Sequence, residues 1–270
     1  MKTFFPCLNR IITPSWNLRQ FIRFATQEGF SAVELRNDLE GLSIDDDMQS
    51  EQLCSLAQDA HITLATINAL QRFNDTDTTL KTRLHELEIL LKIGKQLNME
   101  AIVLCPINGV EPSEAYHQQT VASLEYYGPL FEAYGMLGYV EPLGFACSSL
   151  RTKKEAVLAI QESGYAHCYK LVHDTFHHYL AQETEFFPEL TGIIHISGVI
   201  AQKERDAILD ADRILLTSQD ITRSKQQVET LLEGGFSGYV SFEPFAKEIQ
   251  DLDEHTLSKQ LQSSLQTLRH

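Results

Sequence analysis

Four short apolar segments in the second half of the sequence each end in a side chain that can bind a divalent metal ion. They are residues 138–141, 169–174, 192–195 and 238–243. Three carboxylates and one imidazole suit a single Mn²⁺, Mg²⁺, Co²⁺ or Zn²⁺ ion with coordination positions left for a substrate. The candidate metal ligands are Glu141, Asp174, His195 and Glu243.

A proline directly follows each of the two glutamates, Glu141 and Glu243. Proline ends a strand and keeps the preceding residue extended, so both carboxylates are expected at strand ends. A buried carboxylate is costly without a counter-charge. An ion pair that only stabilises the fold explains either glutamate alone equally well. Both glutamates together with Asp174 and His195 favour a shared metal ion.

Asp174 precedes a segment rich in histidine, and capping a short helix is its alternative role. His173 is on the opposite face of the strand and is expected in the core or behind the ligands. His177 lies one turn further on and is a candidate contact to a substrate hydroxyl, whereas His178 is expected to face solvent. His195 lies between two isoleucines, where an imidazole needs a hydrogen-bond partner, and a purely structural role is the alternative.

Further candidates for substrate binding lie outside this set. Glu34 and Arg36 share one face of an expected strand, because side chains alternate along a strand. Asn68 ends the next expected strand. Arg213 lies in an irregular, acidic stretch, and it is expected either to hold a substrate oxygen or to form a surface ion pair.

Apolar segments alternate with amphipathic segments along the whole chain. Short apolar runs between turn residues are typical of buried parallel strands, and apolar residues at helical spacing are typical of helices. Eight strands that alternate with helices predict an α/β fold, the (β/α)8 or TIM barrel, whose catalytic residues lie at the carboxyl ends of the strands. The expected strands are residues 4–9, 32–36, 62–68, 101–105, 137–141, 169–174, 192–196 and 239–243, and the expected helices are residues 16–27, 50–60, 80–97, 113–134, 153–163, 225–233 and 257–268.

The pattern predicts one barrel domain over residues 1–270, because no linker, repeat or domain boundary interrupts it. An open doubly wound sheet would usually carry a glycine-rich turn after its first strand, and residues 7–10 contain none. Residues 199–224 are the least regular and are expected to form a long loop over the substrate. Trp16 and Phe73 are expected either at the pocket wall or in the core.

Composition and charge limit the partners. The formal net charge of −15 argues against nucleic acid, because phosphate binding needs a basic surface. Five scattered cysteines without a Cys-x-x-Cys pair predict reduced thiols and a cytoplasmic protein. No segment is apolar enough to span a membrane or to serve as a secretory core. The expected partner is a small-molecule sugar or cyclitol, and homo-oligomer formation is left open.

The order and spacing of several motifs resemble the xylose isomerase-like TIM barrels, a superfamily of sugar and sugar phosphate isomerases and epimerases. Within it, the chain is most similar to bacterial 2-keto-myo-inositol isomerases, also called inosose isomerases. The resemblance implies one divalent metal ion on the four ligands and substrate contacts from His177 and Arg213. It also implies acid/base roles for Glu141 and Glu243. The matching segments are residues 33–36, 68–74, 141, 173–177, 194–196, 210–213 and 240–243.

Two segments depart from the inosose isomerase pattern. A glycine-rich turn usually follows the Asp-Arg element, and residues 214–220 contain no glycine. Phe145 lies near a position where those enzymes tend to have a polar residue. Both changes bear on the shape of the substrate and leave the metal ligands intact. DNA-repair endonucleases of the superfamily bind three metal ions through extra histidines, whereas this chain has Glu34 and Asn68 at strand ends.

These observations predict a metal-dependent isomerase or epimerase of a ketose or keto-cyclitol. The metal ion would polarise a ketone, Glu141 or Glu243 would remove a proton from the neighbouring carbon, and a metal-bound enediolate would then be reprotonated. The same scaffold leaves open a sugar or sugar phosphate 3-epimerase, a hydroxypyruvate-type isomerase and a keto-cyclitol dehydratase. A non-catalytic sugar-binding barrel is the alternative from another class.

Overall fold

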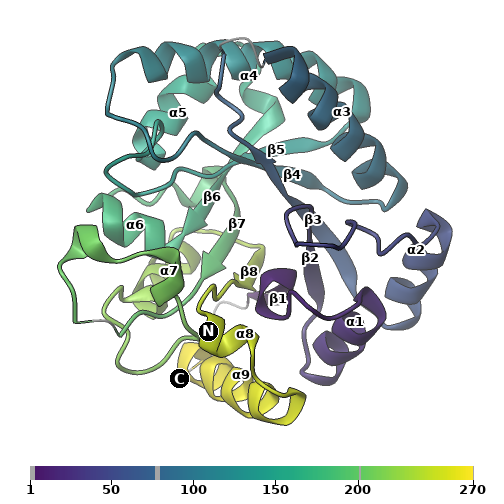
Figure 1. The fold of residues 1–270 in the computed structure, drawn as a ribbon. Coiled ribbons are helices and arrows are strands. Elements are labelled where there is room, and N and C mark those ends of the chain that lie inside the picture. The colour runs from purple at the N-terminus through teal and green to yellow at the C-terminus, as the bar shows by residue number, and fades with distance from the viewer. Residues whose placement is uncertain (1–3, 77–79, 201, 270) are drawn as a thin grey trace.

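The computed structural model describes residues 4–76, 80–200 and 202–269. Eight strands form a closed barrel in which each strand is parallel to the next along the chain and β8 pairs with β1 (Figure 1). The expected (β/α)8 fold is confirmed. The strands are β1 (Phe5–Asn9), β2 (Ala32–Arg36), β3 (Thr63–Gln71), β4 (Ala101–Cys105), β5 (Leu137–Val140), β6 (Tyr169–Asp174), β7 (Thr191–Ile196) and β8 (Tyr239–Phe242).

Helices connect the strands and cover the outside of the barrel (Figure 1). Local capping sets where some of them begin: the Asn17 side chain accepts a hydrogen bond from the Gln20 amide, and Thr152 forms a capping box with Glu155. The α-helices are α1 (Leu18–Gln27), α2 (Ser50–Asp59), α3 (Leu80–Gln96), α4 (Ala115–Tyr134), α5 (Lys153–Glu162), α6 (Thr175–Ala181), α7 (Ser224–Glu233), α8 (Lys247–Gln250) and α9 (Glu254–Arg269). The 3-10 helices are η1 (Arg10–Ile12), η2 (Ala166–Cys168), η3 (Pro188–Leu190), η4 (Arg205–Ala207) and η5 (Asp210–Asp212).

Strand alternation brings the candidate ligands to one end of the barrel interior. Tyr139, Val172 and Ile193 belong to one buried apolar cluster, and a candidate ligand follows each of them two residues later. Because every second residue of a strand points to the same side, those ligands point into the same interior, nearer the carboxyl ends of the strands. The strand register agrees, since Asp174 on β6 is paired with His195 on β7.

The structure corrects several expected boundaries. Strand β3 runs to Gln71 instead of ending at Asn68, and its register with β4 shifts between Ile67 and Leu70. Helix α1 begins at Leu18, because Asn17 caps it. Asp174 is followed directly by the short helix α6, as the capping alternative predicted.

The long loop after β7 has a fixed anchor. In its described part, residues 199–200 and 202–223, it contains 3-10 helices, turns and one isolated bridge at Ile214. Gly198 and Ile214 exchange backbone hydrogen bonds of 2.7 and 2.8 Å, which fold the loop back toward the barrel. Ile214 directly follows Arg213 in the chain. The bridge therefore places Arg213 beside the strand ends.

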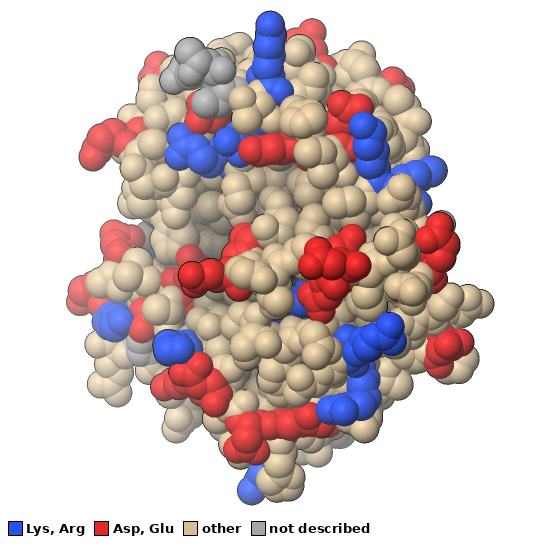
Figure 2. Space-filling model, turned by 45° about the vertical axis from the view of Figure 1, so that its right-hand side comes forward, with Lys and Arg blue, Asp and Glu red and all other residues tan. Residues whose placement is uncertain are grey.

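The surface and the helices bear on the class of partner. On the face shown in Figure 2, acidic and basic side chains are mixed and form no continuous basic surface. A nucleic-acid backbone would need such a surface. None of the helices in the described residues is both long and apolar enough to cross a membrane.

Candidate active site at the carboxyl ends of the strands

The four candidate ligands converge at the carboxyl ends of β5 to β8. Each offers one ligand atom, and these atoms all lie within 4.8 Å of one another. All four residues are buried. We call this set the rim cluster: Glu141, Asp174, His195 and Glu243.

His195 lies at the centre of the rim cluster and contacts three carboxylates. Its Nδ1 is 2.9 Å from Glu141 Oε1 and 3.3 Å from Glu243 Oε2, and its Nε2 is 3.2 Å from Glu34 Oε2. Burial alone would lower the pKa of His195, but the charges of Glu34, Glu243 and Glu141 outweigh it and raise this pKa well above its ordinary value. The imidazole therefore occupies a position that strongly favours a positive charge.

Glu34 lies behind His195 and does not line the cavity described below. Its carboxylate accepts hydrogen bonds from Asn9 at 3.1 Å, from Thr66 at 2.6 Å and from Ser241. Burial would raise its pKa, but the neighbouring His195 and its hydrogen bonds lower it. Glu34 therefore supports the His195 ring and does not line the cavity with Arg36.

Glu243 is held by fixed donors on both of its oxygens. Its Oε1 accepts hydrogen bonds from Arg36 at 2.9 Å, Asn9 at 3.1 Å and Asn68 at 3.3 Å, and its Oε2 accepts one from Arg213 at 3.0 Å. Burial would raise the pKa of Glu243, but His195 and the two guanidinium groups lower it far below the ordinary value. Glu243 is therefore stabilised as a carboxylate.

Glu141 has fewer partners than Glu243. Its Oε1 contacts His195, and its Oε2 accepts a hydrogen bond from the Cys105 thiol at 3.3 Å. No guanidinium group is paired with Glu141 among the salt bridges of the described residues. Both rim glutamates are candidate metal ligands, but among the described residues only Glu243 is paired with guanidinium groups.

Asp174 combines the two roles that the sequence left open. Its Oδ1 accepts hydrogen bonds from the backbone amides of Phe176 at 2.7 Å and His177 at 3.1 Å, which caps α6. Its Oδ2 faces the rim cluster and accepts a 2.6 Å hydrogen bond from Arg213. One carboxylate therefore starts a helix and also faces the other three candidate ligands.

Arg213 is a buried residue and not a surface ion pair. Its side chain is 1% exposed and bonds to Asp174 and Glu243. Its guanidinium also lies 4.9 Å from the ring centroid of Phe176 and 4.6 Å from that of Phe245. Both rings fix the plane of the guanidinium, so the bonds to the two carboxylates are directional.

The buried charges at the rim are not balanced by fixed protein charges. Four carboxylates, with Glu34 included, face the two guanidinium groups of Arg36 and Arg213. With His195 protonated, as its raised pKa favours, one negative charge still lacks a fixed counter-charge, and with the neutral imidazole that a metal ligand requires, two negative charges do. Burying such charges is expensive. The hard oxygen donors and one imidazole suit a divalent cation, which would supply the missing charge. The residues present therefore fit the metal ion that the sequence predicted.

A cavity of about 310 Å³ opens onto the rim cluster. His177, Arg213, Arg36 and Asn68 line it, as expected of substrate-binding residues. His177 Nδ1 is buried and has no hydrogen-bond partner among the residues that the structure describes, which leaves it available to a ligand. The remaining lining residues are Asp38, Gln71, Arg72, Cys105, Pro106, Asn108, Glu141, Leu143, Phe145, Asp210, Glu243 and Phe245.

The expected solvent position of His178 is wrong. His178 is only 8% exposed, and its Nδ1 lies 2.6 Å from the Lys153 amino group. His173 is fully buried and bonds to Gln227, as expected of a residue behind the site. Phe73 is a core residue and does not line the cavity.

Sequence reasoning missed several residues that shape the site. Asn9 ends β1 and joins Glu34 to Glu243, and its place at a strand end was an available signal. Cys105, at the end of β4, gave the same signal. Phe245 had no signal, because its role depends on how the chain turns after Pro244 to stack on Arg213.

A closed parallel barrel with carboxylates and a histidine at its carboxyl rim defines a class of TIM-barrel proteins with a candidate metal centre. The family model for xylose isomerase-like TIM barrels matches residues 22–269. The chain belongs to this family. No curated protein sequence matches the chain.

Solved structures show the same fold. A xylose isomerase domain-containing protein from Salmonella typhimurium LT2 is 33% identical, with a TM-score of 0.91 over 100% of this chain and 98% of that chain. IolI, solved with a bound zinc atom, is 22% identical, with a TM-score of 0.87 over 99% and 98%. D-psicose 3-epimerase from Clostridium cellulolyticum H10, solved with D-tagatose, is 16% identical, with a TM-score of 0.71 over 98% of both chains.

Proposed function

We propose that the chain is a divalent-metal-dependent enzyme that isomerises or epimerises a ketose or keto-cyclitol by proton transfer. The observation that carries this proposal is the rim cluster, whose four ligand atoms lie within 4.8 Å and carry buried negative charge without a full counter-charge. The zinc atom in IolI and the epimerase among the solved structures are in keeping with it.

Glu141, Asp174, His195 and Glu243 would hold the cation, and Mn²⁺, Mg²⁺, Co²⁺ and Zn²⁺ all suit this donor set. When bound, a divalent cation polarises a substrate carbonyl and makes the neighbouring C–H group more acidic. The protein residues must then bind the substrate, remove the proton and return it.

Glu141 is the residue we assign to the proton transfer. It lines the cavity, and among the described residues its carboxylate is hydrogen-bonded to Cys105 and His195 alone. Glu243 is less suited to accept a proton, because Arg36 and Arg213 stabilise its ionised form. In an isomerisation, Glu141 would take the proton from the carbon beside the ketone and return it to the neighbouring carbon. An epimerisation would need a second group on the opposite face to reprotonate the same carbon.

The cavity fits a small polyhydroxylated substrate. Its volume of about 310 Å³ is at the lower end of the ~300–1,000 Å³ usual for ligand pockets. His177 and Asn68 would bind substrate hydroxyls, and Phe145 and Phe245 would provide apolar walls. The rim arginines already bond to carboxylates, so they offer little for a second anionic group such as a phosphate.

Solvent deuterium exchange with Glu141→Gln tests the proposal. The wild-type protein, loaded with metal, should incorporate deuterium into a ketose or inosose at the carbon next to the ketone. Glu141→Gln should keep the fold and lower the exchange rate by about 10²–10⁴-fold, the usual contribution of a placed acid/base group. Cys105→Ser is the matched control, because it alters a neighbour of the same carboxylate and should retain most of the exchange.

The substrates to compare are inososes, free ketohexoses and ketose phosphates, with mass spectrometry as the readout. Exchange at the wild-type rate in Glu141→Gln would remove Glu141 from the reaction. No exchange into any of these substrates by the metal-loaded wild type would refute the proposed reaction class and favour a sugar-binding barrel.

A further inference from the structure

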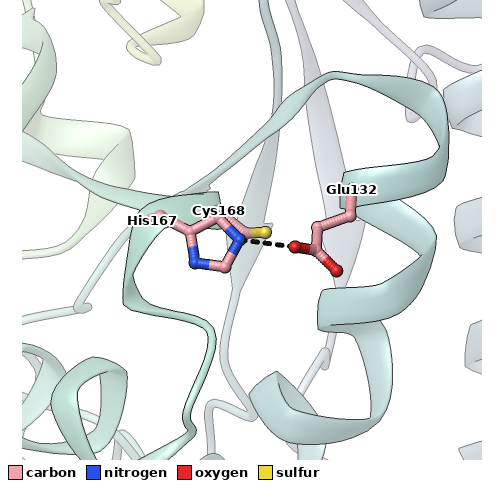
Figure 3. Close-up of side chains that lie close together, drawn as sticks. All are labelled: Glu132, His167 and Cys168. Atoms are coloured by element: carbon pink, nitrogen blue, oxygen red, sulfur yellow. Dashed lines mark hydrogen bonds and ion pairs between the residues drawn. The ribbon is translucent and has the colours of Figure 1, made fainter.

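A second group of side chains that could hold a metal ion lies at the opposite end of the barrel from the rim cluster. Glu132 is in the last turn of α4, and His167 and Cys168 are in η2, directly before β6 (Figure 3). Strand β6 separates Cys168 from Asp174, a distance of about 20 Å at ~3.3 Å per residue. The second group therefore shares no residue with the candidate active site.

The three side chains face one another from two separate elements. His167 Nε2 is 2.7 Å from Glu132 Oε1, and Figure 3 shows the Cys168 sulfur beside this pair. The three potential ligand atoms lie within 4.8 Å of one another. The thiol is nearly buried, with Cys168 3% exposed, whereas the His167 and Glu132 side chains are 61% and 50% exposed.

These distances are close to those that a cation needs. Bonds of about 2.0–2.3 Å to nitrogen, oxygen and sulfur in a tetrahedral site place the donor atoms roughly 3.3–3.8 Å apart. The buried thiol is fixed, but the two exposed side chains can rotate by the ångström or so that is required. A cation would then bind between His167 and Glu132 in place of the hydrogen bond that now joins them.

The surroundings also favour a positive charge at this position. Glu132 lies in the last turn of α4, where the carbonyl groups make the helix end negative. The Cys168 thiol donates only a weak hydrogen bond of 3.7 Å to the Gly128 carbonyl, another group of α4. An exposed histidine–glutamate pair by itself stabilises a fold only weakly, so the pair does not explain why a thiol is buried beside it.

We propose that Glu132, His167 and Cys168 form a second site for a thiolate-binding divalent cation such as Zn²⁺, with water completing the coordination. One sulfur, one nitrogen and one oxygen donor match the ligands that zinc prefers. Because the site joins the end of α4 to the start of β6, its effect is to stabilise the barrel and not to take part in the reaction.

Binding must displace the thiol proton. Burial and the charge of Glu132 raise the pKa of Cys168, so the thiol is protonated in the metal-free protein at neutral pH. A bound cation stabilises the thiolate, and the displaced proton goes to the solvent.

Titration of the full chain with Co²⁺ tests this site separately from the rim cluster. A cobalt–thiolate bond gives a charge-transfer absorption band in the near ultraviolet, whereas oxygen and nitrogen ligands alone do not. We expect a band that saturates at one thiolate-bound ion per chain and that Zn²⁺ abolishes by competition. Cys168→Ser should remove the band, and Glu132→Gln or His167→Ala should weaken Co²⁺ binding by about 10-fold or more.

Two cysteine variants serve as controls. Cys54→Ser changes a partly exposed thiol elsewhere, and Cys105→Ser removes the thiol next to Glu141, so both should keep the band. A band that persists in Cys168→Ser but disappears in Cys105→Ser would assign the thiolate to the rim and overturn the proposal. Absence of any band in cobalt-saturated wild type would do the same.

The two exposed ligands keep the test decisive if Cys168→Ser fails to fold, because unchanged cobalt affinity in both Glu132→Gln and His167→Ala would also refute the site. A failure of the proposed enzymatic function leaves this result unaffected. The Co²⁺ band reports the thiolate, whereas deuterium exchange reports the rim cluster.

Discussion

At the scale of single residues, Arg36 contributes to the difference in bonding between the two rim glutamates, because it pairs with Glu243. Its guanidinium forms two hydrogen bonds with Asp38, at 2.8 and 2.6 Å, and a third with Glu243. The sequence predicted a substrate contact for Arg36, and Arg36 does line the cavity. Its donors are nevertheless largely occupied by carboxylates, which favours a role in positioning Glu243.

Replacing Arg36 by lysine separates these two roles. Lysine keeps the charge but lacks the planar fork that makes two bonds to Asp38 and a third to Glu243, so Glu243 should lose its fixed orientation. We expect kcat to fall by about 10–100-fold with little change in KM, because the substrate contacts remain. Arg72→Lys is the control, since Arg72 lines the same cavity from a half-exposed position. A rise in KM at constant kcat would restore the role of Arg36 as a substrate contact.

The residue types and their strand positions predicted which side chains converge, but not how deep each one lies. Glu34 was expected at the substrate because it shares a strand face with Arg36. Alternation gives the face of a side chain, whereas its depth depends on how the strands are staggered around the barrel. That stagger places Glu34 against His195, outside the cavity lining.

At the scale of elements, α5 and α6 are joined by a buried group that the sequence did not predict. Glu183 accepts hydrogen bonds from the Lys153 amino group at 2.8 Å and from the backbone amides of Lys153 and Lys154. His178 on α6 contacts the same amino group. The expectation that His178 faces solvent failed because α6 is covered on its outer side by Lys153 and Phe186.

This group should make stability depend on pH in the acid range. Burial would raise the pKa of Glu183, but His178 and Lys153 outweigh it and lower the pKa to about 2. A lowered carboxyl pKa contributes stability above the ordinary value near 4.5, and this contribution disappears as pH falls toward 2. Glu183→Gln should therefore be less stable than wild type at pH 6, by about 2 kcal/mol, and the difference should shrink between pH 4.5 and 2.

Urea unfolding at a series of pH values measures this difference. Glu185→Gln is the matched control, because Glu185 forms an exposed pair with Lys154 and should show almost no pH-dependent difference. A constant gap between Glu183→Gln and wild type across the acid range would mean that the pKa of Glu183 is not lowered in the folded chain.

At the scale of the whole molecule, the barrel was predictable because its evidence is repeated along the chain. Each of the eight apolar segments, together with a neighbouring amphipathic helix, predicts the same strand–helix unit. An error at one boundary, such as the end of β3, therefore does not change the predicted fold. The loop after β7 has no such repetition. The position of Arg213 depends on the bridge between Gly198 and Ile214, which no local pattern indicated.

The unbalanced charge at the rim predicts that a divalent cation stabilises the whole barrel. A cation at 100 times its dissociation constant adds about 2.7 kcal/mol to the free energy of unfolding, which corresponds to a rise in Tm of several degrees. Asp174→Ala should abolish most of this rise, because it removes a ligand and the cap of α6. Differential scanning calorimetry of metal-stripped and metal-loaded protein measures the effect.

Cys168→Ser provides the matched background, since it removes the second site and leaves the rim intact. Sodium chloride at equal ionic strength controls for general screening of the net charge of −15. Identical melting curves for stripped and loaded Cys168→Ser would contradict cation binding at the rim.

The carboxylate that faces the rim also starts the helix that carries His177. Helix α6 has little space to shift, because a side-chain carbon at Gly144 would come within 2.0 Å of the His177 carbonyl oxygen. Asp174 therefore sets the position of the residue that we propose binds a substrate hydroxyl. Binding of the proposed ion to Asp174 would thus be coupled to binding of a substrate at His177, and apparent substrate affinity should rise with ion occupancy.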